Sequence, residues 1–199
     1  MWNAIANGFP ISIYRPGIVT GHSGTGVDKP EDLLSRLMTN CIQLDAFPTP
    51  PRQRNHIVPV NYVCAAILHI SQSPANHGQA FNVVLPDQAE TITMAHTFEI
   101  LSACCSTPLR AVSSAEWLQL FRERGKQGMK VATPMLQERL ADSLIWWDTT
   151  GRMATFETAN LRRALADSPD ILNVKPMPKL LRTYFGRWEG VAVDTNGTV

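Results

Sequence analysis

The sequence predicts an α/β fold, because short strand patterns alternate with helical patterns along its first 88 residues. Residues 11–14 are β-branched and aromatic and lie between two prolines, as is typical of a short buried strand. Apolar residues over 32–44 recur at helical spacing. Helical patterns dominate from residue 89 onward. We therefore expect an α/β part over residues 1–88, a mainly helical lobe over 89–190 and a loose tail over 191–199.

The elements of the first part follow from local composition. Residues 1–7 indicate the end of a helix, which Gly8 can close because glycine readily adopts the left-handed conformation of a helix C-cap. Pro30 suits the entry to the second helix. The proline-rich stretch 47–54 predicts a loop. The expected order is strand 11–14, helix 32–44, loop 47–54, extended piece 57–60, helix 61–71 and strand 79–85.

The second part contains fewer strand patterns. A helix is expected over 92–104, and its N-cap is Thr91 or Thr93, since a threonine hydroxyl can accept a hydrogen bond from the first turn. The remaining expected elements are an isolated strand at 109–112, helices at 114–123 and 134–144, a strand at 153–156 and a helix at 159–166. The ordered part is expected to end with residues 177–185. The tail from residue 192 has too few apolar residues to pack by itself.

Composition excludes several classes of partner. The 199 residues include 18 basic and 17 acidic side chains, which leaves a formal charge of +1 and no basic surface for nucleic acid. No apolar run is long enough to span a membrane. Four cysteines lack metal-ligand spacing, so we expect no metal site and free, buried thiols. A cytoplasmic protein is the expectation.

A glycine-rich loop follows the first strand. Its spacing, TGxxGxG from residue 20 to Gly26, is close to the phosphate-binding turn of dinucleotide-binding folds. That turn needs a helix to begin at its last glycine, so that free backbone N–H groups meet the pyrophosphate. Here Gly26 is followed by four residues ending in Pro30, and Asp28 adds negative charge. The context argues against a phosphate-binding loop.

Four segments occur in the order GFPISIYRPGIVTGHSGTG, RNHIVPVNYVCAAI, GQAFNVV and TFETANLRRAL. Together they resemble the carboxyl-terminal half of thioester reductase domains. These domains are extended short-chain dehydrogenase/reductases that terminate polyketide and nonribosomal peptide assembly lines, and they also occur in carboxylic acid reductases. The resemblance implies a partial Rossmann-like fold that lacks the N-terminal nucleotide-binding half, with a small helical substrate lobe.

The resemblance also implies site residues. The segment beside the nicotinamide ring of NADPH corresponds to Arg15, Pro16, Gly17, Ile18 and Val19, where proline and glycine would allow backbone to approach a flat ring. The walls of the cleft for a carrier-bound acyl thioester correspond to Gly21, His22, Ser23, Thr25, Val58 and Pro59. Asn61 stands where the family usually has an acidic residue, and asparagine can serve as a helix cap as well.

The family's catalytic tyrosine and lysine have no counterpart in this sequence. None of its three tyrosines has a lysine four residues later. Hydride transfer to a thioester needs a proton donor at the developing alkoxide. We therefore expect no catalytic residue on this chain and no activity from the chain alone, and we expect NADPH binding to require a nucleotide-binding half on another polypeptide.

Two other functions are compatible with the residues. One is a pseudoenzyme that binds an acyl chain or a carrier protein without redox chemistry. The other is a hydrolase or cyclase that reuses the cleft, with His22 or Ser23 acting on the acyl group. In each case the strands at 11–14 and 79–85 would have unpaired edges, which favours association with the missing half or with a second copy.

Overall fold

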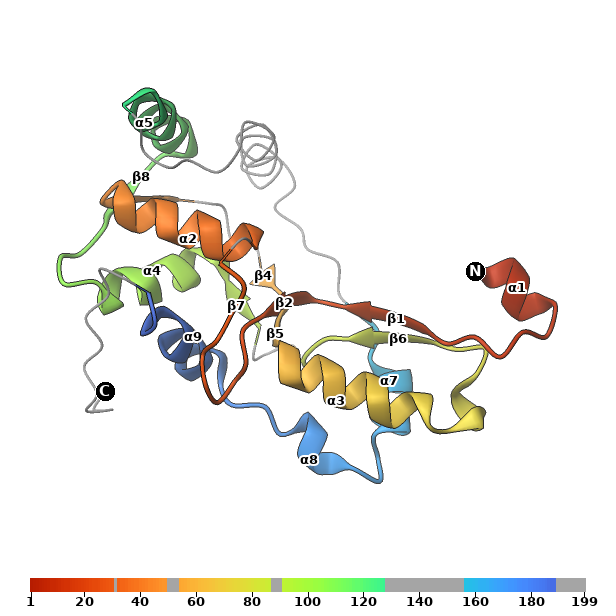
Figure 1. The fold of residues 1–199 in the computed structure, drawn as a ribbon. Coiled ribbons are helices and arrows are strands. Elements are labelled where there is room, and N and C mark those ends of the chain that lie inside the picture. Colours follow the sequence, from red (N-terminus) through yellow and green to blue (C-terminus); the bar gives the residue numbers. More distant parts are fainter. Residues whose placement is uncertain (31, 50–53, 87–90, 128–155, 189–199) are drawn as a thin grey trace.

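The computed structural model describes residues 1–30, 32–49, 54–86, 91–127 and 156–188. Figure 1 shows an elongated arrangement in which one end carries a long strand pair with helices beside it and the other end is a cluster of helices. The elements are α1 (Trp2–Ala6), β1 (Ile13–Pro16), β2 (Ile18–Thr20), α2 (Leu33–Gln43), β3 (Ala46–Pro48), β4 (Arg54–Asn55), β5 (Ile57–Pro59), α3 (Val60–Ser71), η1 (Pro74–Asn76), β6 (Ala80–Val83), β7 (Ile92–Thr93), α4 (Met94–Cys104), β8 (Arg110–Val112), α5 (Ser114–Lys126), α7 (Ala159–Ala164), α8 (Pro169–Leu172) and α9 (Met177–Phe185).

The described strands pair two by two. β1 and β6 are parallel, with Ile13 opposite Ala80, and β2 is parallel to β5. β3 is parallel to β8, whereas β4 and β7 are antiparallel. Long crossovers separate the parallel partners, as parallel pairing requires. The α/β fold class predicted from the alternating patterns is confirmed.

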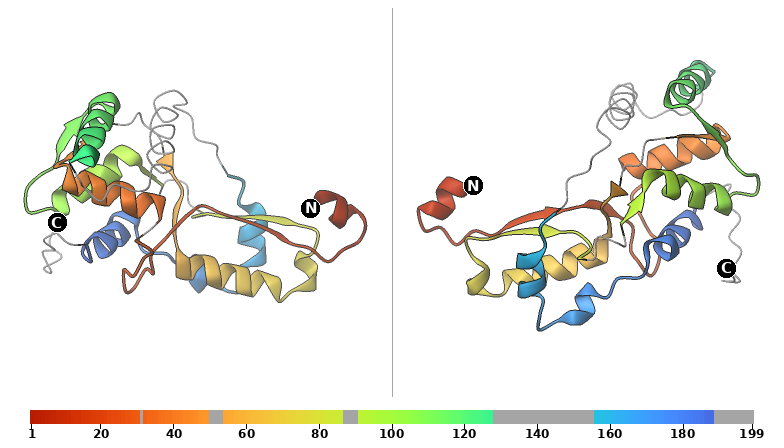
Figure 2. Two further views of the ribbon diagram at one scale, coloured as in Figure 1. Left: turned by 45° about the horizontal axis from the view of Figure 1, so that its top comes forward. Right: turned by 180° about the vertical axis from the view of Figure 1, so that it is seen from behind.

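Helices cover the two ends differently. α3 and α7 flank the β1–β6 pair, and the views of Figure 2 show α1 at the end remote from α2, α4 and α5. The helical end has a continuous core, in which α4 packs against α9 and α5 against β3. Its largest fully buried side chains include Trp117, Phe98 and Phe121. Division of the chain at residue 88 stays a prediction; α7 and α8, from the second part, pack against β6 and α3.

Two strands include a proline that was expected to lie outside them. Strand 11–14 was expected to end before Pro16, yet β1 includes this residue. The N–H groups of Ile13 and Gly17 bond to β6, at Gln79 O and Val83 O. Successive residues alternate in direction, so Pro16 faces the other edge and its missing N–H removes no bond to β6.

The loop expected at 47–54 is wrong in its first residues, because Phe47 and Pro48 belong to β3. Thr49 N–H donates to Val112 O at 2.8 Å, so this hydrogen bond between the two strands does not need the nitrogen of Pro48. The strand expected to be isolated at 109–112 is therefore paired. The helix at 134–144, most of the strand at 153–156 and the tail from 191 lie outside the described residues.

Helix boundaries follow the local signals more closely. Thr93 is the N-cap of α4, and its hydroxyl accepts from the N–H of His96 at 3.1 Å. α5 continues three residues beyond the expected end at 123. In α3, Tyr62 is buried and donates its hydroxyl to Val84 O at 2.8 Å. Burial raises the pKa of this phenol, so it stays neutral and ties the helix to the chain beyond β6.

Candidate substrate groove

The glycines of the loop after β2 are needed for close packing. Gly26 has φ +70°, and a Cβ there would overlap the backbone oxygen of Thr183 in α9. At Gly21 a Cβ would lie 2.8 Å from Val27 O. No helix begins at Gly26, since α2 starts at Leu33. The structure therefore agrees with the argument against a phosphate-binding turn.

His22 organises the tip of this loop. Its Nδ1 accepts hydrogen bonds from the backbone N–H groups of Gly24 and Thr25, at 3.1 and 3.3 Å. An acceptor nitrogen carries no proton, so the neutral ring has its hydrogen on Nε2. His22 is exposed. The hydrogen bonds of the His22 ring therefore hold the tip of the loop in place.

Ser23 is joined to the first turn of α3 by two reciprocal bonds. Its backbone N–H donates to Asn61 Oδ1 at 2.9 Å, and Asn61 Nδ2 donates to Ser23 Oγ at 2.9 Å. On the other side, Lys175 Nζ donates to Ser23 O at 3.3 Å. Three segments that are far apart in sequence thus meet at one serine.

A groove of about 350 Å³ opens at this meeting point. One wall comes from the loop and the start of α3, and the other from α8 and the linker that follows it. The lining is mixed, with a serine hydroxyl, a phenol, two carboxamides, a carboxylate, an ammonium and aliphatic side chains. The lining residues are Ser23, Pro59, Asn61, Tyr62, Ala65, Asp170, Ile171, Asn173, Val174 and Lys175.

The other residues assigned to the cleft walls lie around the groove. Val58 is fully buried in β5 and does not line the groove. Gly21 is buried, whereas Thr25 is exposed and its carbonyl accepts from Arg187 Nη1 at 2.9 Å. The structure therefore brings Ser23 and Pro59 together at one surface and keeps the other residues in supporting positions.

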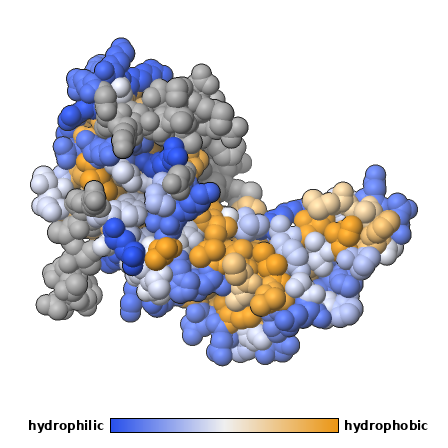
Figure 3. Space-filling model, in the orientation of Figure 1, coloured by the Kyte–Doolittle hydropathy of each residue, from blue (hydrophilic) through white to orange (hydrophobic). Residues whose placement is uncertain are grey.

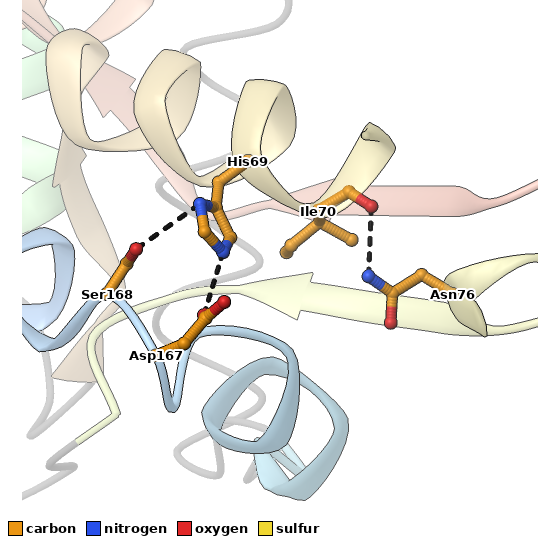
Figure 4. A network of polar contacts seen from close by, with 5 residues as sticks. All are labelled: His69, Ile70, Asn76, Asp167 and Ser168. Atoms are coloured by element: carbon orange, nitrogen blue, oxygen red, sulfur yellow. Dashed lines mark hydrogen bonds and ion pairs between the residues drawn. The ribbon is translucent and has the colours of Figure 1, made fainter. Parts of the chain in front are cut away.

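The opposite wall of the groove is anchored by a polar cluster at the far end of α3. His69 Nε2 lies 2.9 Å from Asp167 Oδ1, and its Nδ1 lies 3.3 Å from Ser168 Oγ (Figure 4). Asp167 and Ser168 are neighbours in sequence, immediately before α8. The cluster has the residue types of a hydrolytic triad, but its geometry joins one helix to the turn between two others. It fixes the start of α8, which carries Asp170 and Ile171 into the groove.

The segment expected beside a nicotinamide ring lies at the carboxyl ends of β1 and β6. Arg15 and Pro16 are exposed, and Ile18 is 41% exposed. Gly17 is required for a different reason from the one expected, because a Cβ there would overlap the carbonyl oxygen of His56. That same oxygen accepts from the N–H of Ile18 at 2.7 Å. Gly17 therefore lets β2 lie against β5.

The groove wall formed by residues 170–175 was not predicted from the sequence. Lys175 is 152 residues from Ser23 in the chain, and no local pattern marks it as part of a site. The residues that the structure describes contain no group of three or more His, Cys, Asp or Glu side chains placed to hold a metal ion. Within the same ranges, no helix has the length and apolar character needed to cross a lipid bilayer.

Solved structures share this fold. The terminal R domain of the myxalamid PKS-NRPS pathway superposes with a TM-score of 0.73 at 24% identity, covering 93% of this chain and 45% of that one. The PhqB reductase domain from Penicillium fellutanum gives 0.56 at 18% identity, covering 92% and 48%. The chain therefore shares the fold of these two reductase domains.

Sequence comparison identifies related proteins. Residues 1–67 match the NAD-binding family described as male sterility protein. The nonribosomal peptide synthetase FrzA of Cladobotryum sp is 42% identical over 162 residues, which are 81% of this chain and 16% of that protein. The aldehyde reductase lnaA of Aspergillus flavus is 36% identical over 185 residues, 88% of this chain and 18% of that protein. The chain is therefore similar in sequence to nonribosomal peptide synthetases and aldehyde reductases, and it spans less than a fifth of the length of these relatives.

Proposed function

We propose that this chain is the substrate-side part of a thioester reductase of polyketide or nonribosomal peptide metabolism. The observation that carries the proposal is the 42% identity to a nonribosomal peptide synthetase over four fifths of the chain. The reaction would reduce a carrier-bound acyl thioester, forming a new C–H bond and breaking the C–S bond. The products would be an aldehyde and the free carrier thiol. Cytoplasmic location belongs to the same proposal, since Cys41 and Cys104 are buried free thiols.

The proposed cofactor is NADPH, which when bound supplies a hydride to the thioester carbonyl. The residues at the carboxyl ends of β1 and β6 fit a nicotinamide ring, because ligands of parallel sheets bind at that edge and Pro16 and Ile18 leave an exposed apolar surface there. They do not fit the phosphates. Asp28 and the six residues between Gly26 and α2 remove the helix N-terminus that a pyrophosphate would need.

The proposed reaction therefore needs the rest of a reductase domain. β1 pairs with β6 on one edge, and no described strand lies at its other edge. The outer side of β6 is covered by α7, where Asn160 Nδ2 donates to Ala80 O at 3.0 Å. Apolar residues gather over α3 and α1 (Figure 3), and they include Leu68 at 63% and Trp2 at 54% exposure. We propose that this edge and these faces receive the nucleotide-binding half, or a second copy when that half is absent.

The groove at Ser23 is the proposed site of the acyl carrier arm. A titration of the chain with octanoyl-pantetheine thioester, followed by calorimetry, is expected to show saturable binding at one site. Octanoate serves as the control ligand, because it has the same alkyl chain without the amides and thioester. Absence of saturable binding by the thioester would contradict the assignment of the groove to the substrate.

A further inference from the structure

We infer that Ser23 presents its hydroxyl hydrogen to the groove, where it binds a carbonyl oxygen of the ligand, and that Asn61 is the positioning residue that makes this hydrogen available. The inference rests on the proposed function of the groove. It names the hydrogen-bond donor in the groove, the direction of its hydrogen and the ligand group that it binds.

The orientation of Asn61 follows from its partners. The backbone N–H of Ser23 can only donate, so the side-chain atom of Asn61 that faces it at 2.9 Å must be the carbonyl oxygen. This fixes which end of the carboxamide is which, because the two ends cannot exchange without placing N–H against N–H. The amide nitrogen of Asn61 must then face Ser23 Oγ.

The direction of the serine hydroxyl follows in turn. Asn61 Nδ2 donates to Ser23 Oγ at 2.9 Å, so the oxygen uses one lone pair to accept this bond. The hydroxyl hydrogen cannot point back at a donor. Since Ser23 and Asn61 both line the groove, the hydrogen is free to meet a ligand there. An aspartate at position 61 would reverse the direction of this hydrogen bond. A carboxylate only accepts, so the Ser23 hydroxyl would donate its hydrogen to residue 61 instead of to the groove.

The surroundings favour a neutral carbonyl as the acceptor. The ammonium of Lys175 already donates to Ser23 O, and the carboxylate of Asp170 lines the same groove. These opposite charges give little net attraction for an anion. Ile171 and Val174 add aliphatic surface. A chain that carries amide or thioester carbonyls between alkyl segments matches this lining, as a pantetheine arm or its acyl group does.

The test compares four variants by calorimetric titration with octanoyl-pantetheine thioester, which is uncharged. Ser23→Ala removes the hydroxyl, and Asn61→Asp keeps it but redirects its hydrogen. Both are expected to weaken binding about threefold to tenfold, as loss of one neutral hydrogen bond does. Ser23→Thr retains the hydroxyl and is expected to bind like the wild type. Ser71→Ala removes a hydroxyl that donates to Leu68 O at the other end of α3 and is the matched control.

Two further ligands identify the carbonyl. Pantetheine without an acyl group keeps the amides of the arm, and octanoyl-N-acetylcysteamine keeps the thioester with a shorter arm. A loss of affinity in Asn61→Asp for either ligand supports the inference and shows which carbonyl is bound. Unchanged affinity of Asn61→Asp for all three ligands, with normal wild-type binding, overturns the inference and leaves the proposed function standing. Absence of wild-type binding overturns both.

Discussion

Gly26→Ala is expected to lower the free energy of unfolding by about 2–5 kcal/mol. Two effects add. Alanine at φ +70° is strained by about 1–2 kcal/mol. Its Cβ would also overlap the backbone oxygen of Thr183 and lie 3.0 Å from Arg187 Cδ, and overpacking of this kind costs about 1–3 kcal/mol. Urea denaturation followed by circular dichroism measures the change.

Two other glycines separate these effects. Gly8 has φ +81° with nothing within 4 Å of an added Cβ, so Gly8→Ala reports strain alone. Gly24 has ordinary φ, and a Cβ there would make only van der Waals contact with His22 at 3.4 Å. Gly24→Ala is expected to change stability by less than about 0.5 kcal/mol. If Gly26→Ala were no more destabilising than Gly8→Ala, the close packing of the loop on α9 would be refuted.

Trp117→Ala is expected to lower the free energy of unfolding by about 3–5 kcal/mol. The side chain is fully buried, stacks on Phe121 with ring centroids 5.2 Å apart, and donates its indole N–H to Ala46 O at 3.0 Å. Truncation would open a cavity between α5 and β3 and leave a buried carbonyl without its donor. We expect the helical end to unfold before the rest of the chain. Circular dichroism of the helices can follow this, because the signal does not depend on the removed tryptophan.

Two further variants separate the contributions of the ring volume and the hydrogen bond of Trp117. Trp117→Phe keeps much of the ring volume and removes the N–H, so it reports the cost of the lost hydrogen bond together with a smaller cavity. Trp2→Ala changes the same residue type at a site that is 54% exposed, and it removes only a contact with the Arg15 guanidinium at 6.0 Å. A loss in Trp117→Ala no larger than in Trp2→Ala would show that α5 does not pack on β3 as described.

Local signals predicted the helices better than the strands. The helix expected at 92–104 ends at the same residue as α4, and the helix at 32–44 extends one residue beyond α2 at each end, because apolar periodicity and caps are carried by neighbouring residues. The pairing of β3 with β8 joins residues more than sixty positions apart, and nothing in either segment indicates its partner. Hence Pro48 was assigned to a loop and residues 109–112 to an isolated strand.

The sequence likewise indicated only part of the candidate site. Resemblance to the family indicated Ser23 and Pro59, which do line one groove, and it indicated Val58, which is buried and does not line it. The reciprocal bonds between Ser23 and Asn61 depend on a loop and a helix start that are 38 residues apart. Asp170 and Lys175 reach the groove because the chain after α7 turns back and packs against α3. Such contacts are set by tertiary packing and have no local signature.

We propose that this chain provides substrate-side residues and that a nucleotide cofactor requires further residues of a reductase domain. Titration of the purified chain with NADPH, followed by nicotinamide fluorescence, tests it most directly. The account predicts a signal that rises in proportion to NADPH without saturation or enhancement. Saturable binding with enhanced nicotinamide fluorescence would contradict the account, because it would place a complete cofactor site on these 199 residues.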